Sequence, residues 1–247
     1  KVYNPGTVQE TVLFRDFSLT VADGSFVSVV GSNGSGKTSL LNILCGSIPV
    51  EQGKILMDNA DITKVKEFRR YRRMGRVYQN PAMGTCPTMN ILENLSMADN
   101  KGKPFNLTRG TNKRRIEAYK AMLAPLGLED KMGIPVGSLS GGQRQALALL
   151  MATMNPIDFL ILDEHTAALD PKTAEIIMEL TAKIVAEKHL TTLMVTHNLR
   201  HALTYGDRLL MLHAGQVVLD RSGEEKQATQ LDDILGLFNA ISIECGN

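Results

Sequence analysis

The chain has 247 residues, of which 43% are hydrophobic and 21% are charged. This composition excludes a chain that is disordered throughout, because enough apolar material is present to bury a core. The net charge of +1 gives no general reason to expect nucleic acid as a partner, and no apolar run approaches the roughly 18 residues of a membrane span. Three cysteines are too few for a disulfide framework, so we expect a soluble, intracellular globular protein.

Strands and helices are predicted to alternate along the chain. The first strands are expected over residues 12–21 and 26–30, and the second is almost wholly apolar, as a strand buried on both faces would be. The later predicted elements are a helix from 37 to about 45, helices over 113–126 and 141–154, a strand over 159–162, a helix over 171–188, a strand over 193–195 and a hairpin over 208–220 that turns at 214–215. This order favours an α/β fold with a largely parallel sheet.

A glycine-rich segment between the second strand and the first helix predicts a phosphate site. Residues 31–38 match the pattern G-x-x-x-x-G-K-[ST], whose glycines let backbone N–H groups surround a phosphate chain. Lys37 would reach the β- and γ-phosphates, and Thr38 would offer its hydroxyl to Mg²⁺. A turn that merely precedes a helix is the alternative, but the strand–loop–helix context is the one this motif requires. The predicted nucleotide ligands are Gly31, Ser32, Asn33, Gly34, Ser35, Gly36, Lys37, Thr38 and Ser39.

Two carboxylates follow the apolar strand predicted at 159–162. An aspartate at the end of a buried strand can hold the Mg²⁺ shell, so Asp163 is a candidate metal residue. Glu164 would point elsewhere and polarise an attacking water as a general base. The alternative is a strand end with solvated acids, and the phosphate loop favours the catalytic interpretation.

Residues 139–143, Leu-Ser-Gly-Gly-Gln, resemble the signature of ATP-binding-cassette (ABC) ATPases. Other marks of that family occur in order along the chain. Gln79 resembles the glutamine of the Q-loop, and Asp170 resembles the aspartate of the D-loop. His197 resembles the switch histidine, and Tyr3 resembles the aromatic residue that stacks on adenine. Taken singly, the glutamine and the histidine would more often be hydrogen-bonded polar residues at strand ends than catalytic residues. A tyrosine near a terminus often packs on the protein surface without binding a ligand.

The resemblance covers about residues 1–222 and implies a P-loop NTPase fold. That fold has a RecA-like core with a mainly parallel sheet, an N-terminal antiparallel β subdomain and an inserted α-helical subdomain. The chain would be a single ABC ATPase domain over 1–247, divided into a nucleotide-binding core (1–80 and 156–222), a helical signature subdomain (81–155) and a C-terminal helical tail (223–247). The implied activity is ATP hydrolysis, with ATP and Mg²⁺ as cofactors.

The resemblance also implies roles for single residues. Glu164, His197 and Gln79 would be catalytic, and Thr38, Gln79 and Asp163 would hold the metal. Because one nucleotide does not need a second anion site at a helix N-terminus, two copies are implied to close head-to-tail around two ATP molecules. The signature and D-loop residues would contact the ATP held by the second copy, namely Ser140, Gly141, Gly142, Gln143 and Asp170.

The expected function is that of the motor subunit of a membrane ABC transporter. Residues 87–95 resemble the stretch where such ATPases meet their membrane subunit, and a soluble ATPase of the iron–sulfur assembly type is the alternative. A DNA-repair or translation-factor protein is disfavoured because the chain has one cassette and no heptad run. The expected partners are a second copy, integral membrane permease subunits and an extracytoplasmic solute-binding protein, but no nucleic acid. We expect a peripheral protein at the cytoplasmic face of the cell membrane that serves an importer of a small solute. A weaker resemblance of residues 3–7 and 164–171 to ATPases that accompany amino-acid binding proteins suggests an amino acid of the aromatic type as that solute.

Two features fall outside this scheme. His165 stands where the family usually has proline, and its imidazole is expected near the hydrolytic water or the dimer seam, unless it is a tolerated loop substitution. Residues 64–76 carry seven basic residues against one acid. Such a run is typical of a solvated face, with anionic lipid head groups as one alternative and nucleic acid as another.

Overall fold

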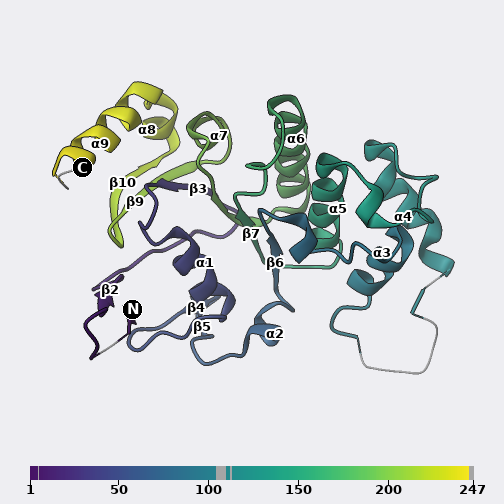
Figure 1. Cartoon of the computed structure of the whole chain (residues 1–247), viewed down its shortest axis with the longest axis horizontal. Helices are drawn as coiled ribbons and strands as arrows, with labels where there is room; N and C mark the ends of the chain where they lie inside the picture. The colour runs from purple at the N-terminus through teal and green to yellow at the C-terminus, as the bar shows by residue number, and fades with distance from the viewer. Residues whose placement is uncertain (5, 104–109, 112, 245–247) are drawn as a thin grey trace. The chain divides into compact units, whose positions relative to one another are not determined.

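The computed structural model describes residues 1–4, 6–103, 110–111 and 113–244 (Figure 1). The chain forms two compact units, which we call the first unit (Lys1–Tyr71 with His189–Asn247) and the second unit (Arg72–Lys188). The predicted division into a core, a helical subdomain and a tail has other boundaries and stays a prediction. Residues 245–247 of the predicted tail lie outside the described residues.

The first unit joins short strand pairs to a larger sheet. Its elements are β1 (Val2–Tyr3), β2 (Thr11–Val12), β3 (Phe26–Gly31), α1 (Lys37–Cys45), β4 (Leu56–Met57), β5 (Ala60–Asp61), α2 (Glu67–Arg70), β8 (Thr191–Val195), α7 (Leu199–Thr204), β9 (Arg208–His213), β10 (Gln216–Ser222), α8 (Gly223–Ala228) and α9 (Leu231–Glu244). Within this unit the sheet order is β10-β9-β3-β8. β3 is parallel to β8 and β9, whereas β9–β10, β1–β2 and β4–β5 are antiparallel pairs.

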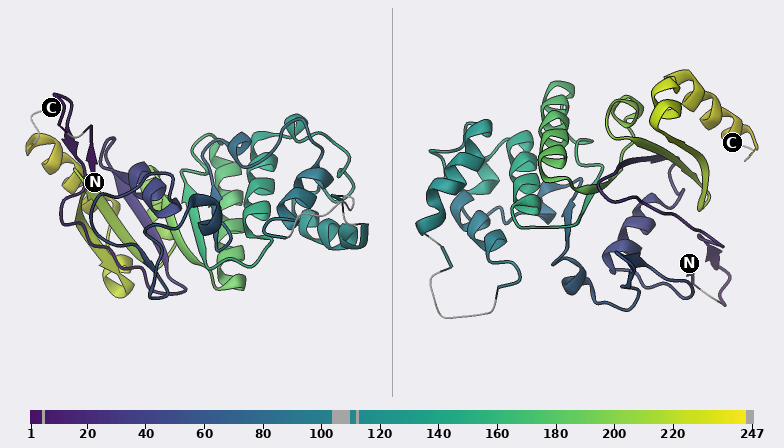
Figure 2. Two further views of the ribbon diagram at one scale, coloured as in Figure 1. Left: turned by 90° about the horizontal axis from the view of Figure 1, so that it is seen from below. Right: turned by 180° about the vertical axis from the view of Figure 1, so that it is seen from behind.

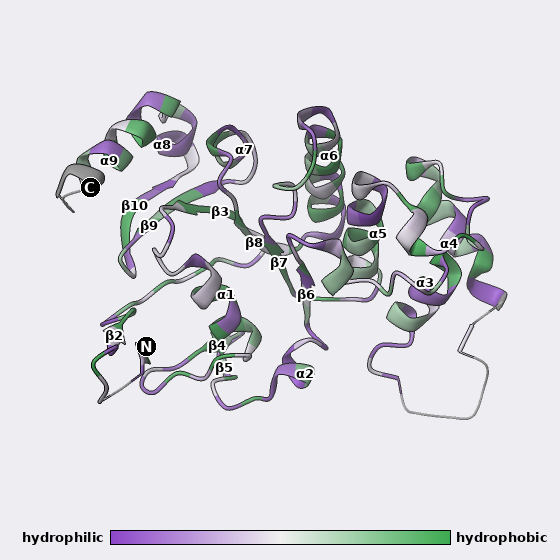
Figure 3. Ribbon diagram, in the orientation of Figure 1, coloured by the Kyte–Doolittle hydropathy of each residue, from purple (hydrophilic) through white to green (hydrophobic). Residues whose placement is uncertain are grey.

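The core of the first unit lies along β3, as its apolar sequence predicts. Every residue of β3 is buried, and the strand is largely green in Figure 3. Val30 of β3 packs in one buried cluster with Ala202 of α7, Leu209 and Met211 of β9, and Ile234 of α9. The C-terminal helix α9 is therefore part of the core of this unit.

The second unit is mainly helical around one parallel strand pair. Its elements are β6 (Met74–Val77), η1 (Pro81–Met83), α3 (Ile91–Asp99), η2 (Lys113–Arg115), α4 (Ile116–Leu123), η3 (Ala124–Leu126), η4 (Val136–Ser138), α5 (Gly141–Thr153), β7 (Phe159–Asp163) and α6 (Pro171–Lys188). β6 and β7 pair in parallel. α5 packs on β6, α3 and α6, and Figure 2 shows α5 and α6 side by side in both views.

Most predicted elements are confirmed, but the first predicted strand is wrong. Only Val12 of residues 12–21 lies in a strand. Leu13 and Phe14 instead donate their N–H groups to the carbonyl of Lys1, and the Phe14 ring packs 4.8 Å from the ring of Phe17. Aromatic and β-branched residues favour a strand only where a neighbouring strand pairs with them. Residues 13–21 lie in no strand, and the Phe14 and Phe17 rings pack against each other instead.

The predicted hairpin, formed by β9 and β10, is confirmed. Ala214 and Gly215 both have positive φ, of 44° and 75°, as a two-residue turn between twisted strands requires. Within the part of the chain that the structure describes, none of the helices combines the length and apolar character that crossing a lipid bilayer demands.

Candidate active site

The phosphate loop lies in the first unit between β3 and α1. Gly31 and Gly36 have positive φ, of 155° and 104°. A Cβ at Gly31 would lie 2.2 Å from the carbonyl oxygen of Leu212, and one at Gly36 would lie 2.9 Å from Cζ of Phe14. Glycine is therefore required at both positions for the backbone to curl inward.

Two features of the loop suit an anion. Gly36 has no side chain that could cap α1, which leaves room for a phosphate at the start of this helix. Lys37 is 6% exposed, and its Nζ donates to the carbonyl oxygens of Gly31 (2.7 Å) and Ser32 (2.9 Å). The loop thus holds a cation at its centre, where phosphate oxygens can replace carbonyl oxygens as its partners.

The β9–β10 hairpin supports this loop from one side, which the sequence did not reveal. The N–H of Gly215 donates to the carbonyl oxygen of Ser35 (3.1 Å). On β9, Nδ1 of His213 lies 3.5 Å from Oγ of Ser32. These contacts join residues that are about 180 positions apart, so no local pattern could have predicted them.

Two other predicted residues of the first unit lie near the loop. Tyr3 donates its hydroxyl to Oγ of Ser39, in the first turn of α1 (3.0 Å). His197 follows β8, and the N–H of Thr196 donates to the carbonyl oxygen of Val29 on β3 (3.1 Å). Because β3 and β8 are parallel, their carboxyl ends meet at one edge, and His197 shares that edge with the phosphate loop.

In the second unit, Gln79, Asp163 and Glu164 also share one edge. β6 and β7 are parallel with Val77 opposite Leu162, so the residues that follow these strands emerge together. Gln145 of α5 is buried and donates to the carbonyl oxygen of Tyr78, which fixes the backbone directly before Gln79 (3.0 Å). The structure therefore brings these three predicted residues to one edge of the strand pair.

Arg76 is a neighbour of this carboxylate edge that sequence reasoning missed. Its guanidinium lies 2.6 Å from Oδ2 of Asp163, and both side chains are largely buried. The same group lies over the ring of Tyr78, 4.6 Å from its centroid. The carboxylate predicted to hold the metal thus pairs with an arginine cation.

The signature residues begin α5 and form a capping box. Gln143 N–H donates to Oγ of Ser140, and Ser140 N–H donates to Oε1 of Gln143, each at 3.2 Å. A Cβ at Gly142 would lie only 2.2 Å from Cγ2 of Thr173, so this glycine allows the starts of α5 and α6 to approach closely. Gly141 lies between the two capping residues and is exposed.

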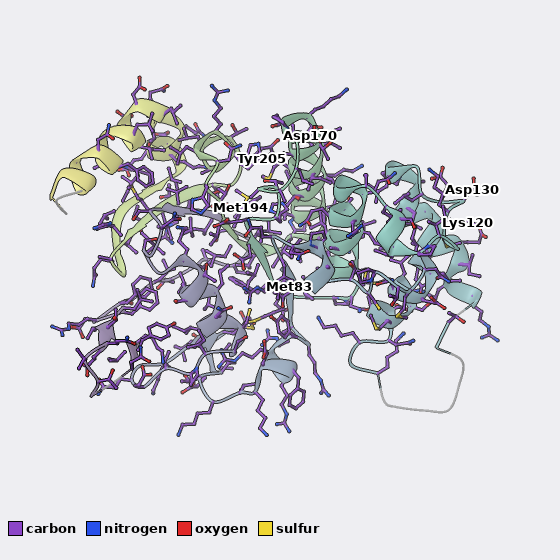
Figure 4. All side chains as sticks on the ribbon, in the orientation of Figure 1. Met83, Lys120, Asp130, Asp170, Met194 and Tyr205 are labelled. Atoms are coloured by element: carbon purple, nitrogen blue, oxygen red, sulfur yellow. The ribbon has the colours of Figure 1, made fainter. Side chains whose placement is uncertain are left out.

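Asp170 caps the start of α6 and lies at that end of the helix in Figure 4. It accepts a hydrogen bond from the N–H of Thr173 (3.1 Å), and its hydrogen bonds with Thr173 lower the pKa of the Asp170 carboxyl. Because Gly142 meets the same Thr173, the structure brings the signature and the D-loop aspartate together on one side of the second unit.

Only some of the basic side chains over residues 64–76 are exposed. Arg70 is 5% exposed and donates to the carbonyl oxygens of Ile43, Leu44, Thr63 and Val65. Arg73 pairs with Asp158, and Arg76 pairs with Asp163. A role of Arg70 in binding lipid is therefore wrong, since it holds α1 in place. Lipid binding stays a prediction for the exposed residues Lys64, Lys66, Arg69 and Arg72.

A family model described as ABC transporter matches residues 14–167, which is more than half of the chain. The chain belongs to the ABC transporter family. A relative in this family, the tyrosine transport ATP-binding protein of Clostridioides difficile (strain R20291), is 48% identical over 93% of this chain and 92% of its own length. A methionine import ATP-binding protein of Rhodopseudomonas palustris (strain ATCC BAA-98 / CGA009) is 32% identical over 93% of this chain and 60% of its own length.

Solved ABC cassettes share the fold. The ADP conformation of an ATP-binding cassette of an ABC transporter has a TM-score of 0.79 and 25% identity, and the match covers 95% of this chain and 93% of that chain. The dimeric post-hydrolysis state of another cassette, bound to ADP and Pi, has a TM-score of 0.75 and 28% identity over 90% of this chain and 95% of that chain. These findings confirm the predicted P-loop NTPase fold, and the chain is an ATPase of this family.

Proposed function

We propose that this chain is the ATP-hydrolysing motor subunit of a membrane importer for an amino acid, with tyrosine as the leading candidate. The observation that carries the proposal is the 48% identity to a tyrosine transport ATP-binding protein over nearly the full length of both chains. Relatives named for methionine import support amino-acid import more broadly. Iron–sulfur assembly is not favoured, because these relatives are named for transport and import.

For ATP binding, we propose that the loop from Gly31 to Ser39 surrounds the phosphates with N–H groups and that Lys37 pairs with the β- and γ-phosphates. Tyr3 would stack on the adenine, and its hydrogen bond to Ser39 supports a place beside the loop. The oxygen donors of Thr38, Gln79 and Asp163 suit Mg²⁺, which prefers such ligands. Bound Mg²⁺ would neutralise charge that develops on the phosphates during hydrolysis.

For hydrolysis, we propose that Glu164 accepts a proton from the attacking water as a general base. Gln79 and His197 would orient that water and the γ-phosphate. Their positions after strands β6 and β8 support this, since ligands of open α/β sheets bind at the carboxyl ends of the strands.

We further propose that two copies enclose two ATP molecules head-to-tail. Ser140, Gly142 and Asp170 would then contact the nucleotide held by the other copy. Their grouping at the starts of α5 and α6 supports one shared contact surface. A solved cassette that is dimeric and bound to ADP and Pi supports a dimer.

A permease at the cytoplasmic face of the membrane and an extracytoplasmic solute-binding protein complete the proposed importer. The stretch predicted to meet the permease, 87–95, is only partly available, because Ile91, Asn94 and Leu95 are fully buried. Exposed apolar side chains flank it: Met83 (labelled in Figure 4) is 68% exposed and Met97 is 51% exposed. We therefore add these two methionines to the proposed permease contact.

The experiment that tests this function uses the whole transporter. The chain is purified with the permease that accompanies it, reconstituted in liposomes, and supplied with the cognate solute-binding protein. We expect ATP hydrolysis to rise when that protein is loaded with L-tyrosine, and to rise less with L-methionine. Stimulation by methionine alone, or co-purification with a soluble cysteine-rich scaffold in place of a permease, would contradict the proposal.

A further inference from the structure

The segment after β7 places Glu164 in a tight and strained turn. The N–H of Ala167 donates to the carbonyl oxygen of Glu164 (2.9 Å), which closes a turn over residues 164–167. Glu164 itself has a φ of +48°, a left-handed conformation that is costly for a residue with a side chain. Such a conformation persists only where the surroundings hold it, so some contact must fix this turn.

His165, the second residue of the turn, makes a buried contact with α6. Its side chain is 2% exposed, and Nε2 lies 3.2 Å from Oγ1 of Thr181, which is fully buried. Of the two expected places, near the hydrolytic water or at the dimer seam, the seam is therefore wrong, because so buried a side chain offers almost no surface to a second copy. The ring points from the turn into the interior of the second unit.

The direction of this hydrogen bond follows from a second contact. Oγ1 of Thr181 lies 2.7 Å from the carbonyl oxygen of Ile177, which can only accept. The single hydroxyl proton of Thr181 is therefore used for Ile177. The Thr181 oxygen must accept from His165, whose Nε2 carries the hydrogen.

This hydrogen bond restrains the turn where proline would do so by its ring. Proline at the second position of such a turn fixes φ in advance. Histidine leaves the unfolded chain more backbone conformations than proline does. In the folded chain, a buried side-chain hydrogen bond can restrain the turn in place of the proline ring. The chain of contacts runs from the carbonyl of Ile177 through Thr181 and His165 to the backbone of Glu164.

We propose that His165 and Thr181 form a positioning pair that holds Glu164 in its orientation for ATP hydrolysis. This inference rests on the proposed role of Glu164 as the general base. His165 itself takes no proton from the attacking water in this scheme, and neither residue of the pair is a catalytic residue.

The test is a double-mutant cycle on the purified chain. Thr181→Val removes the hydroxyl at nearly constant volume, and His165→Phe removes the N–H. We expect each single change to lower kcat about three- to tenfold, as the loss of one hydrogen bond would, with KM for ATP unchanged. Since both changes break the same contact, the double variant should be no slower than the slower single variant.

Thr181→Ser is the matched control, because it keeps the hydroxyl and should keep kcat near that of the wild type. Urea unfolding of every variant separates this role from a structural one, which would lower the unfolding midpoint but leave kcat per folded molecule unchanged. Should His165→Phe fail to fold, the comparison of Thr181→Val with Thr181→Ser still decides. Equal kcat for Thr181→Val and wild type, or factors that multiply in the double variant, would overturn the proposal.

Glu164→Gln, measured alongside the cycle, separates the proposed role of Glu164 from the proposed positioning pair. If it keeps full activity, the proposed role of Glu164 fails. If it loses activity while the cycle shows no coupling, only the positioning pair is wrong.

Discussion

Glu164 is the single residue on which the proposed chemistry depends most. It directly follows the strand β7 and has a left-handed conformation, with φ of +48°. Glu164→Gln keeps the shape but removes the base, so we expect kcat for ATP hydrolysis to fall about 10²- to 10⁴-fold while ATP binding persists. Phosphate release and nucleotide binding measure the two quantities. Glu187→Gln, which alters an exposed carboxylate on α6, is the control; an equal loss there would argue against a specific role.

For single residues, sequence motifs predict which side chains are functional but not which distant side chains contact them. Lys37 and Ser140 could be found from local patterns, because a phosphate loop and a helix cap depend on neighbours in sequence. Arg76 beside Asp163 is 87 positions away from it, and Thr181 meets His165 only because α6 packs against the turn. Contacts of this kind depend on tertiary packing, which a single sequence does not display.

At the scale of elements, Arg70 holds the end of α1. The last carbonyls of a helix lack partners within it, and here Gly46 N–H and the Arg70 guanidinium satisfy several of them. A Cβ at Gly46 would lie 2.8 Å from Nε of Arg70, so the glycine also makes room for the arginine. We expect Arg70→Met to lower the free energy of unfolding by about 1–3 kcal/mol, because buried carbonyls lose their donors.

Urea unfolding followed by circular dichroism measures this loss. Arg69→Met is the matched control, since Arg69 is exposed on the same short helix. If both variants were equally stable, the buried contacts of Arg70 would contribute nothing measurable, contrary to this account.

Lys226 connects α8 to the end of α7. Its Nζ donates to the carbonyl oxygens of Tyr205 (labelled in Figure 4) and Gly206, each at 2.6 Å. Burial lowers the pKa of Lys226 from 10.5 to about 8. Between these pH values the unfolded chain keeps a proton that the folded chain has lost, so this lysine makes the unfolding free energy rise as pH rises.

Lys226→Met removes that dependence. We therefore expect the Tm of the wild type, relative to that of Lys226→Met, to increase between pH 7 and pH 10. Differential scanning calorimetry at several pH values checks the trend. Lys183→Met, which changes an exposed lysine on α6, is the control, and the Tm difference between wild type and this variant should not change with pH. If the Tm difference between wild type and Lys226→Met stayed constant or fell as pH rises, the assignment would be refuted.

The elements were predictable where their residues carry a complete local signal. β3, α1, α5, β7 and α6 each have an apolar core pattern and a cap or turn residue at an end. β6 was missed, because Met74–Val77 is a short stretch interrupted by glycine and arginine and is defined by its pairing with β7. Residues 13–21 failed for the opposite reason, since their strand propensity has no partner strand.

At the scale of the whole molecule, the phosphate loop lies in the first unit and the signature lies in the second unit. Each set of residues is held by contacts within its own unit, such as Gly215 on Ser35 and Thr173 on Gly142. We propose that both sets serve the hydrolysis of ATP, the activity of the ABC transporter family to which the chain belongs. The head-to-tail dimer is the central proposal for the whole molecule.

Sedimentation velocity of the Glu164→Gln chain tests that central claim most directly. ATP should convert the monomer to a dimer, because hydrolysis no longer removes the γ-phosphate that joins the copies, and ADP should leave it monomeric. A second variant adds Ser140→Asp, which keeps a good helix cap but sets a negative charge against the phosphates, so it should stay monomeric with ATP. A Glu164→Gln chain that binds ATP yet remains a monomer, or a dimer that Ser140→Asp leaves intact, would contradict the account.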